Sequence, residues 1–225
     1  RPKTYPGASG PWKPRNYDKK FHGPVSLREA LSRSINIPSI KLIQAIGPPS
    51  VIGVAKRMGI KTRLQNVLSL ALGANEVTLL DITSAYGVLA AEGMRAEPMT
   101  ILRIEDRNGN AVEEYREYHE EVLQPDVSYM ITDMLTSVID EVHGTGAAAR
   151  QYGLDIPVAG KTGTTDEYTD AWFIGYSPEI VIGVWAGYDE RKTIGDGMTG
   201  ARVALPVWIE TMKAAYPDNR GPAFN

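Results

Sequence analysis

The segment of this sequence with the clearest chemical capacity is a lysine followed by small polar residues. It consists of one lysine, one glycine and three threonines, Lys161-Thr162-Gly163-Thr164-Thr165. The preceding apolar run predicts a strand, and alternation along it would send Lys161 and Gly163 to one face and the first two threonines to the other. The segment therefore offers an ammonium, hydroxyls and backbone N–H groups, which suit a carboxylate and a developing oxyanion.

Ser34 and Asn36 form a second polar pair, at a predicted helix end just before Pro38. The hydroxyl of Ser34 can relay a proton, and the amide of Asn36 can donate to a carbonyl while it accepts from a lysine. Each motif alone is weak, because Lys-Thr-Gly is common in exposed turns and Ser-x-Asn is common at helix ends. The functional hypothesis depends on finding both in one chain.

Several other kinds of function are disfavoured by composition. The chain has no cysteine, which excludes a thiol nucleophile and a cysteine-bound zinc, and its three histidines, His22, His119 and His143, are too scattered for a metal site. We therefore expect no metal and no cofactor. A formal net charge of −3 without a basic stripe argues against nucleic-acid binding.

The elements that must position the two motifs are predicted in a simple order, helices first and a sheet later. Residues 1–25 read as an extended connecting segment rich in Pro and Gly, without regular strand. Residues 26–150 read as mostly helical, with a hairpin near 99–115 around an Asn-Gly turn. Residues 151–214 should hold the sheet strands and a C-terminal helix, and residues 215–225 a tail.

Local signals refine both parts. Ser26 and Glu29 fit a capping box that starts a helix, which we expect Pro38 to interrupt before it resumes at Ser39. The runs 158–164, 171–176 and 180–188 are short, apolar and punctuated by glycine, so they predict three adjacent antiparallel strands. A helix at about 201–214 should pack on them. These patterns indicate an α+β fold with a helical subdomain on an antiparallel sheet.

The two motifs and the segments around them resemble the transpeptidase domain of class A penicillin-binding proteins. Ser-x-Asn and Lys-Thr-Gly belong to the motif set of that family and of the serine β-lactamases. The similar segments are colinear and lie between Trp12 and Met212. They are Trp12–Asp18, Gly23–Leu31, Ser34–Pro38, Leu70–Ala74, Ala159–Thr165, Asp170–Tyr176 and Val184–Asp189. The resemblance implies the penicillin-binding, serine β-lactamase-like fold.

The resemblance also implies roles for the motif residues in acyl transfer between peptidoglycan stem peptides. Lys161 would supply positive potential near the substrate carboxylate, and the hydroxyls of Thr162 and Thr164 would bind it. The Thr164 N–H would be one of two oxyanion donors. Ser34 would relay a proton to the leaving amine, and Asn36 would hold a catalytic lysine and the substrate amide.

The remaining site residues implied by the resemblance are expected to shape the binding cleft. They are Gly163, Thr165 and Trp172, although the tryptophan is also a natural packing residue. The expected ligands are peptidoglycan stem peptides and β-lactams. The expected location is the extracytoplasmic face of the bacterial inner membrane, with the anchor in a segment outside this chain, because no run here is long enough to span a bilayer.

One departure from the family pattern is informative. The first family motif, Ser-x-x-Lys, supplies the nucleophilic serine, yet no serine in this chain is followed three residues later by lysine. We therefore expect the chain to be an incomplete domain, with the nucleophile just upstream of Arg1 in the same protein. The chain alone is then predicted to be inactive.

Two alternatives remain open from the sequence. The first is a non-catalytic penicillin-recognition or scaffold module of the same fold, which an upstream Ser-x-x-Lys would distinguish from an enzyme. The second and weaker alternative is a β-lactam hydrolase. Class A β-lactamases need a glutamate that activates deacylating water, usually followed four residues later by asparagine, and this chain has no such pair.

Overall fold

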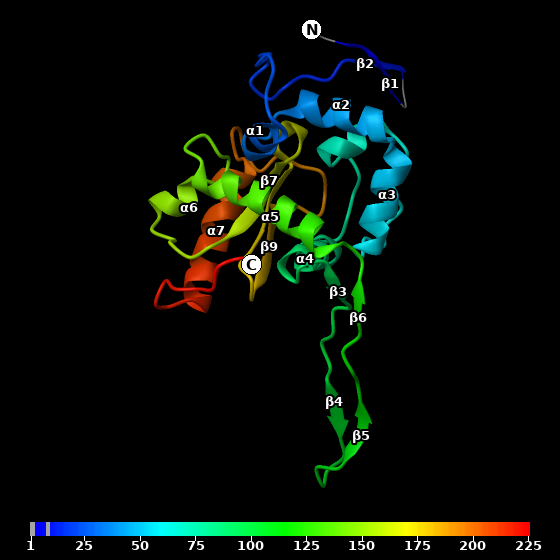
Figure 1. Cartoon of the computed structure of the whole chain (residues 1–225), viewed down its shortest axis with the longest axis vertical. Coiled ribbons are helices and arrows are strands. Elements are labelled where there is room, and N and C mark those ends of the chain that lie inside the picture. The colour runs from blue at the N-terminus through cyan, green and yellow to red at the C-terminus, as the bar shows by residue number, and fades with distance from the viewer. Residues whose placement is uncertain (1–2, 8–9) are drawn as a thin grey trace.

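A three-stranded antiparallel sheet forms the centre of the molecule (Figure 1). The computed structural model describes residues 3–7 and 10–225. The sheet has the order β7 (Ala159–Thr164), β8 (Asp170–Tyr176), β9 (Val181–Gly187). Gly163 lies opposite Trp172 in β8, which in turn lies opposite Trp185 in β9. The three strands predicted from glycine-punctuated apolar runs are thus confirmed.

One face of the sheet is covered by α7 (Gly200–Ala215) (Figure 1). Phe173 of β8 packs against Trp208 with ring centroids 4.8 Å apart, and both side chains are fully buried. Trp208 also donates its indole N–H to the carbonyl of Gly175 at 3.3 Å. The predicted packing of the last helix on the sheet is confirmed.

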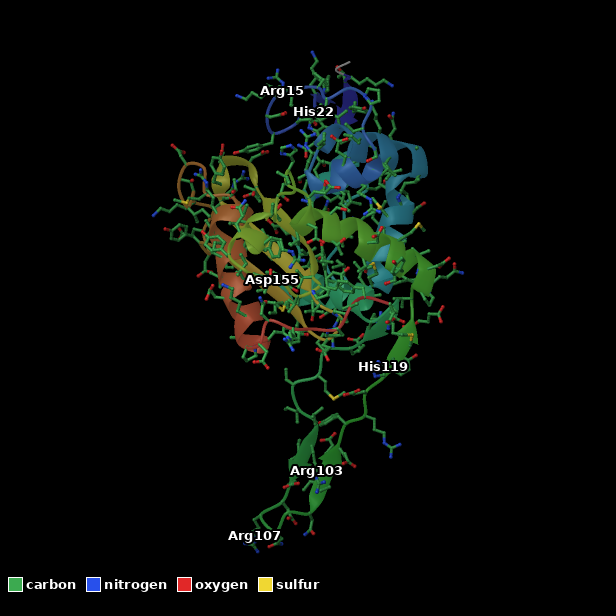
Figure 2. All side chains as sticks on the ribbon, turned by 60° about the vertical axis from the view of Figure 1, so that its left-hand side comes forward. Arg15, His22, Arg103, Arg107, His119 and Asp155 are labelled. Carbon is green, nitrogen blue, oxygen red and sulfur yellow. The ribbon has the colours of Figure 1, made fainter. Side chains whose placement is uncertain are left out.

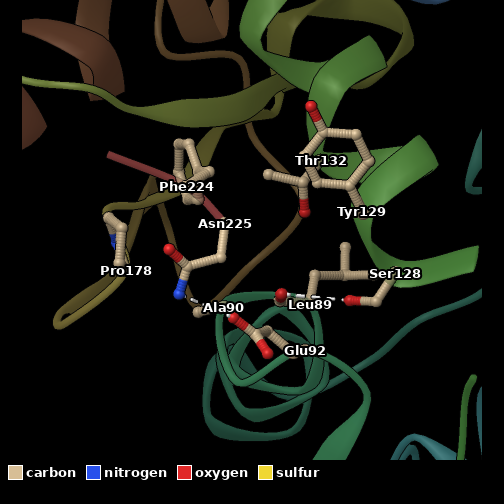
Figure 3. Close-up of a pocket in the computed structure, with 9 residues that line it drawn as sticks. All are labelled: Leu89, Ala90, Glu92, Ser128, Tyr129, Thr132, Pro178, Phe224 and Asn225. Atoms are coloured by element: carbon tan, nitrogen blue, oxygen red, sulfur yellow. Dashed lines mark hydrogen bonds between the residues drawn. The ribbon is translucent and has the colours of Figure 1, made fainter. Parts of the chain in front are cut away.

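The other face is covered by α4 (Leu79–Ala90) and α5 (Pro125–Asp140). The hydroxyl of Tyr176 lies 2.9 Å from that of Thr132, deep between sheet and helix. At the end of the chain, Phe224 packs edge-on against Tyr176, and Asn225 bonds to Glu92 at 3.2 Å. Figure 3 shows these terminal residues beside a small cavity of about 30 Å³ between α4 and α5.

The described residues contain several further helical elements. They are α1 (Leu27–Ser32), α2 (Asn36–Ile46), α3 (Pro48–Arg57), η1 (Leu68–Leu72), α6 (Ala148–Gln151) and η2 (Asp166–Tyr168). Ser26 caps α1 as predicted, because its side chain accepts from the Glu29 N–H at 3.0 Å. In the part of the chain that the structure describes, no single helix is long and apolar enough to span a membrane.

The prediction that Pro38 interrupts a helix was wrong. Pro38 lies in the first turn of α2, which already begins at Asn36. The first residues of a helix have no intrahelical acceptor for their N–H groups, so a proline there removes no bond. The chain instead breaks at Ser34, which has a left-handed backbone with φ 56°.

A two-stranded arm projects from the body next to α4 (Figure 1). At its base β3 (Met94–Ala96) pairs with β6 (His119–Glu121), and near its tip β4 (Arg103–Glu105) pairs with β5 (Ala111–Glu114). Figure 2 shows His119 near the body and Arg107 at the far end. The hairpin predicted near 99–115 corresponds to β4 and β5, and the second strand pair, β3 with β6, lies between this hairpin and the body.

The first residues also differ from expectation. Instead of extended chain without regular strand, β1 (Tyr5–Gly7) pairs with β2 (Gly10–Trp12). Gly10 has φ 127°, which favours glycine, and the rings of Tyr5 and Trp12 lie 6.2 Å apart. The Pro and Gly content that predicted irregular structure therefore coexists with a short ribbon.

Candidate active site

Ser34 and Lys161 come together although 127 positions separate them in the sequence. The ammonium of Lys161 donates to the hydroxyl of Ser34, with Nζ and Oγ 2.9 Å apart. Ser34 lies in the turn between α1 and α2, where its N–H donates to the Leu31 carbonyl and the buried Ile35 anchors the next position. The two predicted motifs thus face each other across one short contact.

Lys161 is held on the side of β7 that faces the helical part of the molecule. Its ammonium also donates to the carbonyl oxygen of Thr162 at 3.1 Å. Desolvation by the surrounding protein lowers the pKa of Lys161 from the ordinary 10.5 to about 8. All the acceptors recorded around the ammonium in the described part of the chain are neutral, so an anion bound beside it would stabilise its charged form.

The neighbouring threonines use their hydroxyls differently. Thr162 donates to the hydroxyl of Thr145 at 2.8 Å. The Thr164 hydroxyl oxygen accepts from the N–H of Gly200, at the start of α7, at 3.0 Å. Because the Thr164 hydroxyl is the acceptor in that bond, its own proton can be donated to another group. The Thr162 hydroxyl also lies 3.5 Å from the Lys161 ammonium, so the polar ends of these two neighbouring side chains stay close together although alternation predicts opposite faces for them.

The Thr164 N–H points to the outer edge of the sheet. Thr165 donates its N–H to the Asp170 carbonyl at 3.2 Å, across the end of the β7–β8 pair. In an antiparallel ladder the residues that exchange such bonds alternate with residues whose N–H groups point away. Because β7 is an edge strand among the described residues, the Thr164 N–H is directed away from β8.

The other predicted site residues have mainly local partners. Asn36 donates its side-chain N–H to the carbonyl of Arg15 at 2.9 Å. Thr165 accepts from the Asp170 N–H at 2.8 Å and so shapes the turn before β8. Trp172 packs beside Gly163, where an added Cβ would lie 3.0 Å from the Trp172 Cβ. The amide oxygen of Asn36 has no hydrogen bond to Lys161 within the described part of the chain.

Sequence reasoning missed two residues that hold the site together. Thr145 contacts Thr162, and Gly200 passes so close to β7 that an added Cβ would lie 2.4 Å from the Gly163 carbonyl oxygen. The Gly144-Thr145-Gly146 run gives no signal of this role in the sequence, because glycines that follow a helix commonly serve only to end it. The cavity of Figure 3 contains none of the predicted site residues.

Comparisons with known proteins identify the family. The family model for the penicillin binding protein transpeptidase domain matches residues 1–193. The chain belongs to this family. The resemblance and the fold class predicted from the motifs are therefore confirmed.

Two curated relatives give the degree of similarity. The chain is 45% identical over 221 residues to penicillin-binding protein 1A of Aquifex aeolicus. The matched region covers 97% of this chain and 30% of the relative. It is 37% identical to penicillin-binding protein 1A of Rickettsia bellii, over 92% of this chain and 29% of the relative. The chain thus spans about 30% of the length of these relatives.

Solved structures agree on the fold. The crystal structure of penicillin-binding protein 1A from Haemophilus influenzae matches with a TM-score of 0.89 and 27% identity, over 100% of this chain and 39% of that one. PonA1 from Mycobacterium tuberculosis in complex with penicillin V matches with a TM-score of 0.82 and 22% identity, over 99% of this chain and 64% of that one. The second likeness bears on the fold alone.

Proposed function

We propose that this chain is part of a penicillin-binding D,D-transpeptidase, which cross-links peptidoglycan stem peptides by acyl transfer. The observation that carries the proposal is the 2.9 Å contact between Ser34 and Lys161, which joins the second and third family motifs in one site. Membership of the transpeptidase family supports the same reaction class. The whole protein is proposed to act at the extracytoplasmic face of the inner membrane, anchored by a segment outside these residues.

In this proposal the residues of β7 recognise the substrate carboxylate. The ammonium of Lys161 supplies the positive charge, and Thr164 supplies a hydroxyl donor. Thr162 donates its hydroxyl to Thr145 and accepts from Lys161 at 3.5 Å, so it is proposed to bind the carboxylate indirectly, by orienting that ammonium. The bond from Gly200 to the Thr164 hydroxyl oxygen supports the role of Thr164, because it leaves the Thr164 proton for the carboxylate. Gly163, Thr165 and Trp172 are proposed to shape the strand edge along which the stem peptide or a β-lactam lies.

The chemistry then proceeds in two steps. A serine gives its proton to the lysine of its Ser-x-x-Lys motif and attacks the penultimate D-alanine carbonyl. An ester forms, the amide bond to the terminal D-alanine breaks, and that residue leaves as an amine. An amine from a second stem peptide next attacks the acyl-enzyme and releases the serine. The outward Thr164 N–H is proposed as an oxyanion donor, and Ser34, which accepts from Lys161, keeps its own proton to pass to the leaving amine.

The nucleophilic serine is proposed to lie outside these residues. None of the serines here is followed by lysine three positions later, so the chain has no Ser-x-x-Lys motif. Asn36 would hold the lysine of that motif, because its amide oxygen accepts no hydrogen bond from the residues that the structure describes. Losing a nucleophile and one oxyanion donor removes several orders of magnitude of rate, so the chain alone is proposed to be inert.

Labelling with a fluorescent penicillin tests the proposal. The 225-residue chain is expected to take up no covalent label, whereas a longer form of the same protein with an upstream Ser-x-x-Lys segment is expected to be labelled. A Lys161→Ala variant of the longer form should label at least about tenfold more slowly. Covalent labelling of the isolated chain would refute the absence of a nucleophile.

The same experiment separates the alternatives. Reversible penicillin binding by the longer form without covalent labelling would favour a non-catalytic recognition module. Rapid release of hydrolysed penicillin after labelling would favour a β-lactam hydrolase. Stable labelling that is blocked by a stem peptide ending in D-Ala-D-Ala is the outcome that the transpeptidase proposal requires.

A further inference from the structure

The loop between α5 and α6 is built to present one threonine to the candidate active site. Gly144 and Gly146 flank Thr145 and press against the end of α5. A Cβ at Gly144 would lie 2.3 Å from the Val138 carbonyl oxygen, and the Gly146 N–H donates to that same oxygen at 2.9 Å. Because only glycine fits at 144, the loop has little freedom and Thr145 has a fixed place.

Thr145 contacts both halves of the site. Its N–H donates to the carbonyl of Ser32 at 3.0 Å, two residues before Ser34. Its hydroxyl accepts from Thr162 at 2.8 Å, one residue after Lys161. Thr145 therefore connects the turn that carries Ser34 with the strand that carries Lys161.

Glu141, at the start of this loop, makes a second contact with the end of α1. Ser32 is fully buried, and its hydroxyl donates to a carboxylate oxygen of Glu141 at 2.7 Å. Farther along α1, the Arg28 guanidinium donates to the hydroxyl of Ser137 in α5 at 2.9 Å and also pairs with Asp133. Since β7 packs on the same helix, α5 is the common support for both motifs.

We infer that Thr145 is a positioning residue for the acyl-transfer site, an inference that rests on the function proposed above. It holds the hydroxyl of Thr162 in one orientation beside Lys161, and through Ser32 it fixes the turn of Ser34. It touches neither the substrate nor the reacting atoms in this role. Its effect reaches the reaction through Thr162.

Replacement of the hydroxyl tests the inference in a longer form of the protein that contains Ser-x-x-Lys. Thr145→Val keeps the shape and the backbone N–H but removes the acceptor for Thr162. The second-order rate constant for acylation by a fluorescent penicillin is expected to fall about three- to tenfold, as for the loss of one hydrogen bond. Thr145→Ser keeps the hydroxyl and should stay within about twofold of the parent.

Two further variants separate positioning from general stability. Thr211 is a matched control, because its hydroxyl bonds to the Val207 carbonyl on the outer side of α7, so Thr211→Val should leave acylation unchanged. In a Thr162→Val background, Thr145→Val should cost less than about twofold more, because the hydroxyl it positions is already gone. Thermal unfolding of each variant is recorded alongside.

The outcomes are distinct. If the parent is not acylated, the proposed function fails. If the parent is acylated and Thr145→Val reacts equally fast, the positioning role of Thr145 is wrong. It is also wrong if Thr145→Ser loses as much as Thr145→Val, or if the loss is undiminished in the Thr162→Val background.

Discussion

Lys161 carries its positive charge at a partly desolvated position, where the charged form of a side chain is disfavoured. The ammonium is partly withdrawn from water, and its two closest partners, Ser34 and the Thr162 carbonyl, are neutral. Desolvation is the cause of its lowered pKa of about 8. A lysine in this position is stabilised by a carboxylate bound beside it, and the proposed substrate provides one.

This lowered pKa predicts how stability depends on pH. The folded state releases the Lys161 proton near pH 8 and the unfolded state near pH 10.5. Between these values the unfolded state binds more protons, so the free energy of unfolding should rise with pH, by about 2 kcal/mol up to pH 10. Urea unfolding at about pH 7, 8, 9 and 10 measures this.

Lys161→Met is the matched control for that titration. Half-buried tyrosines such as Tyr86, whose pKa is raised by desolvation to about 12, are common to both proteins, so the difference between their two stability curves isolates Lys161. The parent should gain stability relative to Lys161→Met from pH 8 upward. A difference that stays constant with pH would contradict the lowered pKa.

At the scale of elements, β8 and α7 pack so closely that only glycine fits at position 175. A Cβ at Gly175 would lie 2.7 Å from the Trp208 ring and 2.8 Å from the Phe173 ring. Both rings are fully buried and have no space to retreat. This contact sets the height of the helix over the sheet, and with it the approach of Gly200 to the Thr164 hydroxyl.

Gly175→Ala is therefore expected to destabilise the protein by about 1 to 3 kcal/mol, because overpacking a core forces its neighbours to move. Gly53 in α3 provides the opposite case, since nothing lies within 4 Å of an added Cβ. Gly53→Ala should stabilise by about 0.5 to 1 kcal/mol through its higher helix propensity. Urea unfolding of both variants checks the pair, and equal effects would contradict this reading of the packing.

At the scale of the whole molecule, the arm built from β3 to β6 is separate from the core. Every residue from 100 to 121 is exposed, and the buried side chains lie in the body. Figure 2 shows Arg103 and Arg107 far from Arg15 and His22 at the other end of the molecule. The arm therefore contributes little to the packing that holds the site.

Shortening the arm should leave the body intact. Replacement of residues 100–117 by a short Asn-Gly turn is expected to change the free energy of unfolding by less than about 1 kcal/mol, because surface changes rarely cost more. Thermal and urea unfolding measure this. A loss of several kcal/mol would mean that the arm supports the body through contacts that its exposure does not reveal.

The sequence by itself determined the local structure and the family. The glycine-punctuated runs predicted the three strands, and Ser26 predicted the start of α1. Such features are encoded by residues a few positions apart, so periodicity and capping reveal them. The motif letters, Ser34 with Asn36 and Lys161 with its threonines, were sufficient to indicate the transpeptidase family.

Only the tertiary structure decided how those residues meet. The contact of Ser34 with Lys161, the link through Thr145 and the start of α2 before Pro38 depend on how α1 and β7 pack against α5. The hydrogen bond between Lys161 and Ser34 joins residues 127 positions apart, so no local sequence pattern predicts it. The glycines beside Thr145 read as an ordinary helix stop, because close backbone packing, and not local propensity, is what requires them.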